Sequence, residues 1–300
     1  MNLKKKIKRT LTVSLTKTAI LCFNIIPRQF AILIGASIGL LAWKLLKKEQ
    51  KNVFENLTTA YGTSLTDSQK YKIGKSFFIN SGKNLIDVLR FKKYYHKQIK
   101  PLITIEGLEH FDKAYNKGKG VFGVTGHIGN FELLAVWIQN AGYDVAVIGR
   151  EMYDKRMDKL LIDNRTSMGL TNIATTDSPK KIIKWLKDGK AIGVLIDNDS
   201  FRVRSMFIPA FGKPSNTPIG QSIIGLKTGA AFVPMACVRS GDNCYKIIIK
   251  PEVTIEQTDN FDDDVYNITL KCTQALEEII NDHKDQWIWI HNRWHTRPNV

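Results

Sequence analysis

Short apolar runs alternate along the chain with segments in which apolar residues recur at helical spacing. Short apolar or β-branched runs lie at LITIEG, GVFGVTGH, YDVAVIGR, AIGVLID and AAFVPMACVR, with helical patterns between them at 132–140, 153–167 and 179–188. Strands that alternate with helices indicate a largely parallel sheet covered on both faces. A turn signal, Ser240-Gly241-Asp242, precedes NCYKIIIKPEV and predicts a hairpin at one edge of the sheet. We therefore expect an α/β fold with a mostly parallel or mixed central sheet flanked by helices.

Three further helices follow from the same periodicity, at 53–61, 67–91 and 261–282. The second has a start signal, because Gln69 follows Thr66 by three residues, the spacing of a capping box.

The amino-terminal region begins with a basic cluster, MNLKKKIKRT, and continues with two apolar stretches. The uncharged stretch between Arg28 and Lys44 is shorter than the ~20 residues that span a bilayer. Three structures remain open: a marginal span, an interfacial helical hairpin and a buried core helix. Lysines flank both apolar stretches and favour the anionic cytoplasmic leaflet, so we expect membrane attachment. Gly35 and Gly39 form a G-x-x-x-G pattern, which alone is weak support for helix pairing.

Composition narrows the functional classes. The chain of 300 residues carries a net charge of +16, which favours acidic partners: nucleic acid, an anionic membrane, or an acidic protein or ligand. No RNP, zinc-finger or helix-turn-helix signature supports nucleic acid. The four cysteines form no C-x-x-C pair and indicate a reducing, cytosol-facing location without a catalytic cysteine. Since no repeat or linker interrupts residues 49–300, we expect one domain there, preceded by a membrane-associated segment at residues 1–48.

The stretch VFGVTGHIGNFELLAVWI places a base and a carboxylate close together. His127 and Glu132 are five residues apart, a spacing that puts them on different faces of a continuous helix. They meet only if His127 lies in the loop before the helix and Glu132 lies in its first turn. Gly126 and Gly129 loosen that loop, and Asn130 is a favoured helix N-cap.

Such a pair predicts general base catalysis. A carboxylate bonded to one imidazole nitrogen fixes the tautomer and leaves the other nitrogen as a base. This is the acid and histidine part of a serine-hydrolase triad without the serine, so the hydroxyl must come from a substrate. Beside a membrane, the pattern predicts acyl transfer to a lipid alcohol, with His127 as the base and Glu132 orienting it. The alternative is a hydrogen-bonded histidine of structural importance only, which this motif does not exclude.

GHIGNFELLA is similar to the His-x-x-x-x-Asp/Glu motif of the lysophospholipid acyltransferase superfamily. It resembles in particular the lipid A biosynthesis branch, the late lauroyl and myristoyl transferases. Further segments resemble that branch in the same order along nearly the whole chain: NRTSMGL, GVLIDNDS, PAFGKPSNTPIGQSIIGLKTGAAFVPM and QWIWIHNRWHTRP. The chain departs from the branch at Asn198, Ser215 and Asp285, which puts the fine substrate preference in doubt rather than the reaction class.

The resemblance implies a glycerolipid acyltransferase-like fold at the cytoplasmic face of the cell inner membrane. It implies acyl carrier protein as the thioester donor, with acyl-CoA as the rival, and a phosphorylated Kdo-linked lipid A precursor as the glycolipid acceptor. Because a thioester is already activated, we expect no metal or redox cofactor.

Four further residues, besides Asn130, are candidates for substrate binding. Arg165 can fork two hydrogen bonds to a phosphate or an acyl carbonyl, or can be a plain surface arginine. Asp197 and Asp199 follow a strand and can orient His127 or Arg165, bind a sugar or cap a turn. Thr217 precedes a proline in the pattern of a helix start, whose free N–H groups can hold a phosphate or an oxyanion.

Several alternatives stay open. His291 and His295 have the i, i+4 spacing of metal ligands, but no clear third ligand accompanies them, so we expect no metal site. The acceptor can instead be a lysophospholipid, an aminolipid or a phosphatidylinositol mannoside. A non-catalytic, basic membrane-binding protein is the alternative from another functional class.

Overall fold

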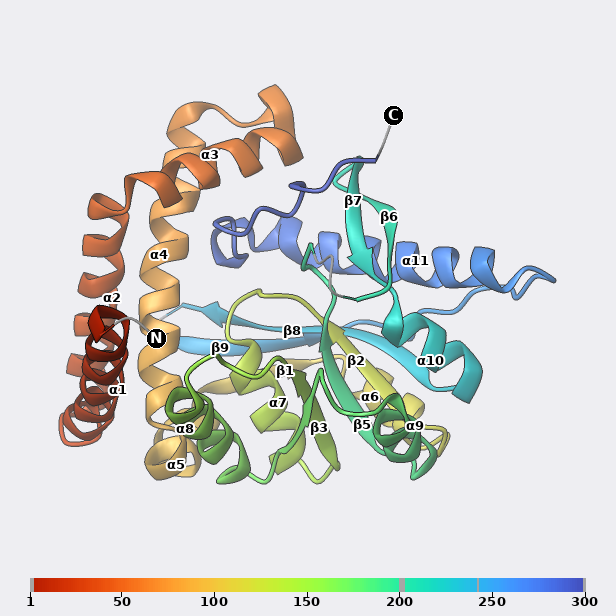
Figure 1. Cartoon of the computed structure of the whole chain (residues 1–300), viewed down its shortest axis with the longest axis horizontal. Helices are drawn as coiled ribbons and strands as arrows, with labels where there is room; N and C mark the ends of the chain where they lie inside the picture. Colours follow the sequence, from red (N-terminus) through yellow and green to blue (C-terminus); the bar gives the residue numbers. More distant parts are fainter. Residues whose placement is uncertain (1–2, 200–202, 242, 299–300) are drawn as a thin grey trace.

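Seven strands form one mixed sheet in the computed structural model, which describes residues 3–199, 203–241 and 243–298. The strand order is β1-β9-β8-β2-β5-β3-β4, and all neighbours are parallel except β8 and β9 (Figure 1). The strands of this sheet are β1 (Ile103–Glu106), β2 (Val121–Thr125), β3 (Val145–Gly149), β4 (Thr171–Ala174), β5 (Ala191–Leu195), β8 (Ala231–Ser240) and β9 (Cys244–Ile249). The predicted α/β class with a mostly parallel mixed sheet is confirmed.

The helices that connect and cover the strands are α3 (Lys47–Tyr61), α4 (Asp67–Leu89), α5 (Phe91–Tyr94), α6 (Leu108–Tyr115), α7 (Phe131–Asn140), α8 (Lys155–Thr166), α9 (Pro179–Lys187), α10 (Gly220–Thr228) and α11 (Phe261–Asp282). The predicted capping box at Thr66 and Gln69 is present at the start of α4. The helix predicted at 261–282 has the bounds of α11. Strong local start signals and a long apolar period explain why these two elements were predictable.

One prediction about the strands needs correction, and one small sheet was missed. The hairpin after Ser240 is confirmed, but β9 is not an edge strand, because β1 pairs with its outer side. Asp242 of that turn lies outside the described residues, as does Ser200 at the end of GVLIDNDS. A second, two-stranded sheet, β6 (Ser205–Ala210) with β7 (Lys213–Pro218), was not predicted. The polar sequence KPSNTP carries no strand period, and only its pairing with SMFIPA makes it a strand.

Alternate residues of the central strands face two different cores. Phe122 and Val124 of β2 point to the face covered by α11 and the carboxyl-terminal tryptophans. Val121 of the same strand points to the face covered by α6 and α7. On that second face, Gly123 and Thr125 line a cavity rather than a packed core. The period-two alternation of a strand thus decides which β2 residues reach the site.

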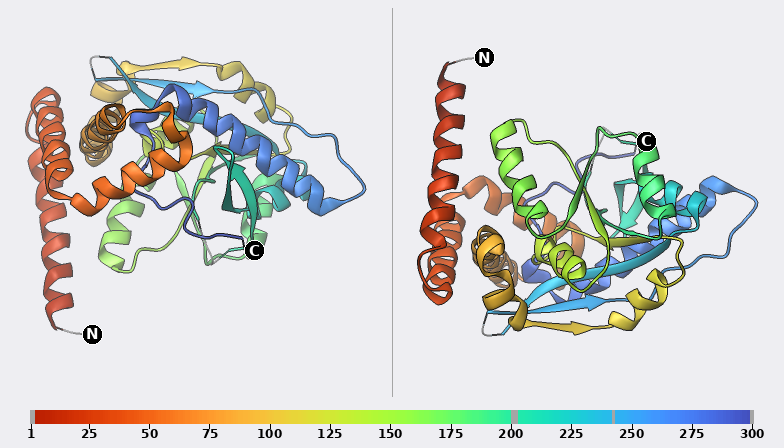
Figure 2. Two further views of the ribbon diagram at one scale, coloured as in Figure 1. Left: turned by 90° about the horizontal axis from the view of Figure 1, so that it is seen from above. Right: turned by 90° about the horizontal axis from the view of Figure 1, so that it is seen from below.

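The amino-terminal region forms α1 (Leu3–Phe23) and α2 (Arg28–Leu45), which lie together on one side of the molecule against α4 (Figures 1 and 2). The G-x-x-x-G pattern lies at the contact of α2 with α4. A Cβ added to Gly39 would lie 2.2 Å from the Phe78 carbonyl oxygen, and one added to Gly82 would lie 2.1 Å from that of Gly35. The absence of side chains therefore lets the two helix backbones touch.

Both α1 and α2 expose large apolar side chains, and on α1 these lie among exposed lysines such as Lys8 and Lys17. The exposed apolar side chains include Ile7, Leu11, Leu15, Leu21, Phe30, Leu33, Ile38, Leu41 and Leu45. Within the described part of the chain, α2 is the one helix whose length and apolar composition would suffice to cross a membrane. Only 28% of that segment is buried, whereas a core helix would be mostly covered. The exposure fits membrane attachment better than the buried core helix that the sequence left open.

Candidate active site

His127 lies in the loop at the carboxyl end of β2, beside the carboxyl end of β5. Its Nδ1 lies 2.8 Å from Asp197 Oδ1, and its backbone N–H donates to Asp197 Oδ2 over 2.7 Å. The indole N–H of Trp287 donates to the same Oδ2 over 2.8 Å. Since an ionised carboxylate only accepts hydrogen bonds, the Nδ1 nitrogen carries the proton and Nε2 is the basic nitrogen.

The environment keeps this pair ionisable despite its burial. Burial disfavours the charged imidazole, but the charge and hydrogen bond of Asp197 outweigh it and raise the pKa of His127 above its ordinary value. Burial also opposes ionisation of Asp197, yet His127 and the N–H donors lower the pKa of that carboxyl to about 2. Asp197 is therefore a fixed negative charge that stabilises the protonated imidazole and makes His127 a stronger base.

The predicted contact of Glu132 with His127 is not formed. Glu132 lies in the first turn of α7, as expected, but its carboxylate faces Arg165 of α8 instead. The Arg165 guanidinium donates two hydrogen bonds to this carboxylate, and the one from Nε to Oε2 measures 2.9 Å. Both side chains are nearly buried, at 13% and 15% exposure, so the ion pair is fixed by its surroundings. Asp197, one of the residues that the sequence offered for orienting His127, makes that contact.

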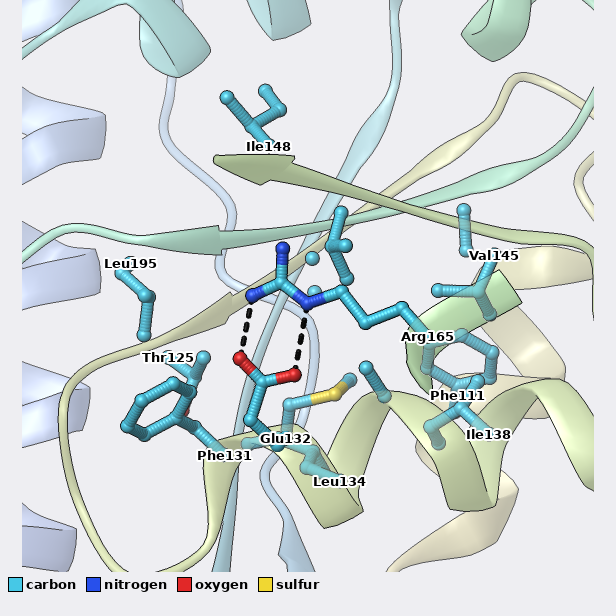
Figure 3. Close-up of a pocket in the computed structure, with 16 residues that line it drawn as sticks. Phe111, Thr125, Phe131, Glu132, Leu134, Ile138, Val145, Ile148, Arg165 and Leu195 are labelled. Atoms are coloured by element: carbon cyan, nitrogen blue, oxygen red, sulfur yellow. Dashed lines mark hydrogen bonds and ion pairs between the residues drawn. The ribbon is translucent and has the colours of Figure 1, made fainter. Parts of the chain in front are cut away.

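An apolar cavity opens beside this ion pair, between α7 and the sheet. Figure 3 shows Glu132 and Arg165 paired among the residues that line it. Its walls come from β2, β3, β5 and α7, with additions from α6, α8 and β8: Phe111, Gly123, Thr125, Phe131, Glu132, Leu134, Ala135, Ile138, Val145, Val147, Ile148, Arg165, Ala191, Gly193, Leu195 and Met235. Thr125 and Phe131 flank His127 in sequence, and the Phe131 ring centroid lies 5.2 Å from that of His127. The cavity therefore starts next to the base and runs toward the amino-terminal ends of the strands.

Two other predicted binding residues, Asn130 and Asp199, make structural hydrogen bonds. Asn130 is the N-cap of α7, as predicted, and accepts a hydrogen bond from Leu133 N–H over 3.1 Å. Asp199 accepts hydrogen bonds from Thr296 and Asn216, so it ties down the carboxyl-terminal segment and contacts neither His127 nor Arg165 in those bonds.

The predicted helix start at Thr217 is wrong. Thr217 and Pro218 end strand β7, and α10 begins at Gly220. The side chain of Thr217 is buried and accepts a hydrogen bond from Arg293 Nη2 over 2.6 Å. The sequence predicts Pro218 as the first residue of a helix. In the structure, antiparallel pairing with β6 extends strand β7 through Pro218 instead.

Comparison with protein families matches residues 2–296 to the family described as bacterial lipid A biosynthesis acyltransferase. This chain belongs to that family. The match covers almost the whole chain and confirms the resemblance of the sequence segments. The protein is accordingly an acyltransferase family enzyme.

Among characterised proteins, this acyltransferase is similar to enzymes with two kinds of acceptor in their names. It is 23% identical over 280 residues to the lipid A biosynthesis palmitoleoyltransferase of Escherichia coli K12, covering 91% of this chain and 87% of that protein. It is 25% identical over 279 residues to the lipid A biosynthesis lauroyltransferase of the same strain, covering 91% and 88%. It is 21% identical over 214 residues to a phosphatidylinositol mannoside acyltransferase of Mycobacterium tuberculosis, covering 69% and 66%.

The sequence predicts that His291 and His295, with Trp287, Trp289 and Trp294, form an aromatic and basic segment that packs on the domain or faces the membrane interface, and it does not place them beside His127. The His291 ring lies 5.0 Å from that of His127, centroid to centroid, and burial lowers the pKa of His291. Trp287, Trp289 and Trp294 pack with Phe211 inside the domain. Across the described residues, no group of three or more histidines, cysteines or carboxylates lies placed to hold a metal ion. The W-x-W-x-H spacing was visible in the sequence, but its position behind Asp197 was not.

Proposed function

We propose that this acyltransferase moves a fatty acyl chain from the thioester of acyl carrier protein to a hydroxyl of a lipid A precursor. The reaction takes place at the cytoplasmic face of the inner membrane. His127 acts as the general base, and Asp197 orients it. The observation that carries the proposal is the hydrogen-bonded pair of His127 and Asp197 at the mouth of an apolar cavity.

The chemistry requires one proton to move through His127. The Nε2 nitrogen takes the proton of the acceptor hydroxyl as its oxygen attacks the thioester carbonyl. The C–S bond then breaks, and the imidazolium returns the proton to the departing thiolate. Asp197 stabilises the imidazolium between these steps, as the buried acid of a catalytic triad does. His127 and Asp197 thus do the work of a triad in which the substrate supplies the hydroxyl.

Glu132 and Arg165 have a different role in this proposal. The two hydrogen bonds from Arg165 fix its guanidinium at the cavity mouth, where an acyl carbonyl or an acceptor phosphate would lie. A fixed positive charge near a developing oxyanion stabilises the transition state without reorganisation. Glu132 therefore acts by holding Arg165 and by adding negative charge near His127, which also raises the pKa of His127 after the larger effects of burial and Asp197.

The chemistry of the cavity lining suits an acyl chain. Apart from Thr125, Glu132 and Arg165, its lining is apolar, and the polar groups lie at the end nearest His127. The small residues Gly123, Ala191 and Gly193 leave open the space that side chains would otherwise fill between α7 and the sheet. A thioester would thus lie beside the base while its hydrocarbon chain lies out of water.

The similarity to both lipid A enzymes along 91% of the chain favours a lipid A precursor as acceptor over a phosphatidylinositol mannoside. The net charge of +16 suits an acidic donor such as acyl carrier protein. Acyl-CoA is an anion too, so the choice of acyl carrier protein rests on the family resemblance. The exposed apolar side chains of α1 and α2 supply the membrane attachment.

The test is a transfer assay with purified protein in detergent. Labelled acyl carrier protein thioester or acyl-CoA is offered with a Kdo-bearing lipid A precursor, a phosphatidylinositol mannoside or a lysophospholipid. We expect transfer to the lipid A precursor, and loss of that transfer in His127→Ala. Transfer to another lipid alone would reject the lipid A acceptor but keep the mechanism. Absence of transfer to all three would leave a basic membrane-binding protein.

A further inference from the structure

A buried polar cluster lies behind the loop that carries His127. At its centre the carboxylate of Asp87 on α4 is fully buried, and it accepts hydrogen bonds from Arg239 Nη2 over 2.9 Å and from Tyr245 over 2.8 Å. Arg239, on β8, also donates from Nε to Asn84 Oδ1 over 2.7 Å. The cluster therefore joins helix α4 to strands β8 and β9 through charge-assisted bonds, which are the strong ones in a dry environment.

This cluster contacts the catalytic loop directly. The amide of Asn84 donates to the Gly129 carbonyl over 2.8 Å, and the amide of Asn130 donates to the Tyr245 hydroxyl over 3.1 Å. Gly129 has a φ of +57°, and a Cβ there would lie 2.0 Å from the Cys237 carbonyl oxygen. The loop thus lies against β8, where Asn130 N–H donates to the Cys237 carbonyl over 2.7 Å, and the Asn84 side chain adds a bond to the backbone two residues after His127.

The same cluster reaches α2. Arg28, the first residue of α2, donates from Nε and Nη2 to the two carboxylate oxygens of Asp87, each over 2.8 Å. Its Nη2 also donates to the Asn243 carbonyl in the β8–β9 turn over 3.0 Å. Together with the glycine contacts of α2 and α4, these bonds connect the apolar helix α2 to the catalytic loop through one side of α4.

We propose that Asn84 is a positioning residue for His127, and that Arg28 supports it from α2 through Asp87. The inference rests on the proposed function of His127 as the base. Asn84 suits the role because its amide donates to the loop carbonyl while its oxygen accepts from Arg239. A leucine makes neither bond, so the loop loses its side-chain link to α4 and to Arg239 and keeps its backbone bonds from Asn130 N–H to the Cys237 carbonyl and from Gly129 N–H to the Gln286 carbonyl.

The expected consequence is a weaker contact between His127 and Asp197. The groups that face His127 are Asp197 from the end of β5, Glu132 from α7 and His291 from the carboxyl-terminal segment. Of these, Asp197 makes the hydrogen bond, and movement of the loop lengthens it. The imidazole of Asn84→Leu should then titrate at a lower pH than that of the unchanged protein.

The experiment compares Asn84→Leu and Arg28→Gln with two matched controls in the full chain in detergent. Asn140→Leu removes an amide that bridges the Val136 and Met168 carbonyls over 2.8 and 3.1 Å, at the end of α7 opposite to the loop. Arg156→Gln removes an arginine from a different aspartate pair, with Asp154. The readouts are the pKa of His127 from NMR of labelled histidine, assigned with His127→Gln, the kinetic constants for transfer, and thermal unfolding.

For Asn84→Leu we expect kcat to fall at least about tenfold, with KM for the thioester nearly unchanged, because misplacement of a reacting group chiefly costs turnover. The pKa of His127 should fall by about half a unit or more, since Asp197 is the partner that raises it. Arg28→Gln should change both quantities in the same direction and by less. Both controls should leave them unchanged.

Unaltered His127 titration and kcat in a folded Asn84→Leu protein would overturn the proposal and leave Asn84 with a stabilising role only. If Asn84→Leu does not fold, Asn84→Ser removes the same bonds without adding bulk and decides the question. Absence of transfer in the unchanged protein would refute the proposed function, while the His127 pKa would still test the positioning by Asn84.

Discussion

Gly193 offers the sharpest test of the proposal that the cavity holds the acyl chain. It lies in the middle of β5 and lines the cavity there. Leu195 lines the cavity at the carboxyl end of the strand, which is the end near His127, and Ala191 lines it at the amino end. A Cβ added to Gly193 meets Val147 Cγ1 at 3.6 Å and Ala146 O at 3.9 Å, which are ordinary contacts. Strand β5 can therefore accept Gly193→Val, and the two methyl groups would fill the cavity at mid-depth.

The size of the effect follows from strand geometry. Four residues from Leu195 to Ala191 span about 13 Å at roughly 3.3 Å per residue. A C–C bond of about 1.5 Å advances roughly 1.25 Å along an extended chain, so a plug at mid-depth excludes about five methylenes. At about 0.8 kcal/mol for each buried methylene, the loss is about 4 kcal/mol for a chain that reaches the floor. This corresponds to up to about a thousandfold in relative specificity.

The assay is competition between acyl donors that differ only in chain length. Gly193→Val should move the preferred chain to one about five carbons shorter, with the rate on that short chain close to that of the unchanged protein. Gly220→Val is the matched control, because a Cβ at Gly220 meets open space away from the cavity. An unchanged length preference in a folded Gly193→Val protein would refute the assignment of the cavity to the acyl chain.

Four further predictions concern the charged groups and the apolar face. Asp197→Asn should lower kcat at least about a hundredfold, measured in the transfer assay, because the imidazolium loses its counter-charge. The rate of the unchanged protein should fall as pH drops through a value above 6.5, since Asp197 raises the pKa of His127, and a pH–rate profile measures that limb. Glu132→Gln should destabilise the fold by about 2 kcal/mol in denaturant unfolding, because Arg165 stays nearly buried without its partner. Leu33→Glu should weaken binding to anionic vesicles at least about tenfold in sedimentation, because a carboxylate replaces an exposed apolar side chain of α2.

Each of these predictions has an outcome that contradicts it. If Asp197→Asn kept the kcat of the unchanged protein, Asp197 would have no role in the mechanism. A transfer rate that stays constant down to pH 6 would show that His127 does not titrate in the reaction. Equal stability of Glu132→Gln would mean that solvent satisfies Arg165. Equal vesicle binding by Leu33→Glu, with Phe261→Glu on α11 as the control at an exposed apolar residue remote from α2, would move the membrane contact elsewhere.

The sheet and most of its helices could be predicted from the sequence because their signals are local. The runs at 121–125, 191–195 and 231–238 are largely apolar on both faces, as strands in a covered parallel sheet must be. The β6–β7 hairpin escaped prediction because its second strand, Lys213–Pro218, is polar and contains two prolines. Its strand character comes from tertiary pairing, which no local pattern encodes.

The candidate site was predictable only in part, for a topological reason. His127, Glu132 and the N-cap Asn130 lie within one short segment, so their approximate positions follow from a strand, a loop and a helix start. The partner of His127 lies seventy residues away in sequence and reaches it because β5 pairs with β2. No local motif determines the order of strands in the sheet. From the sequence, Asp197 was therefore one of several candidate partners of His127, and the pairing of β2 with β5 was needed to identify it.

The structure also explains why the carboxylate nearest in sequence is not the one that orients the base. Glu132 occupies the first turn of α7, from which its side chain points across the cavity mouth to α8, where Arg165 meets it. His127 stays on the loop, and its own backbone N–H and Nδ1 both turn toward the end of β5. A single carboxylate that binds both atoms fixes the backbone and the ring together, which Glu132 could not do from the helix. In the proposed mechanism the two acids therefore have separate roles: Asp197 orients the base, and Glu132 holds the cation beside the cavity.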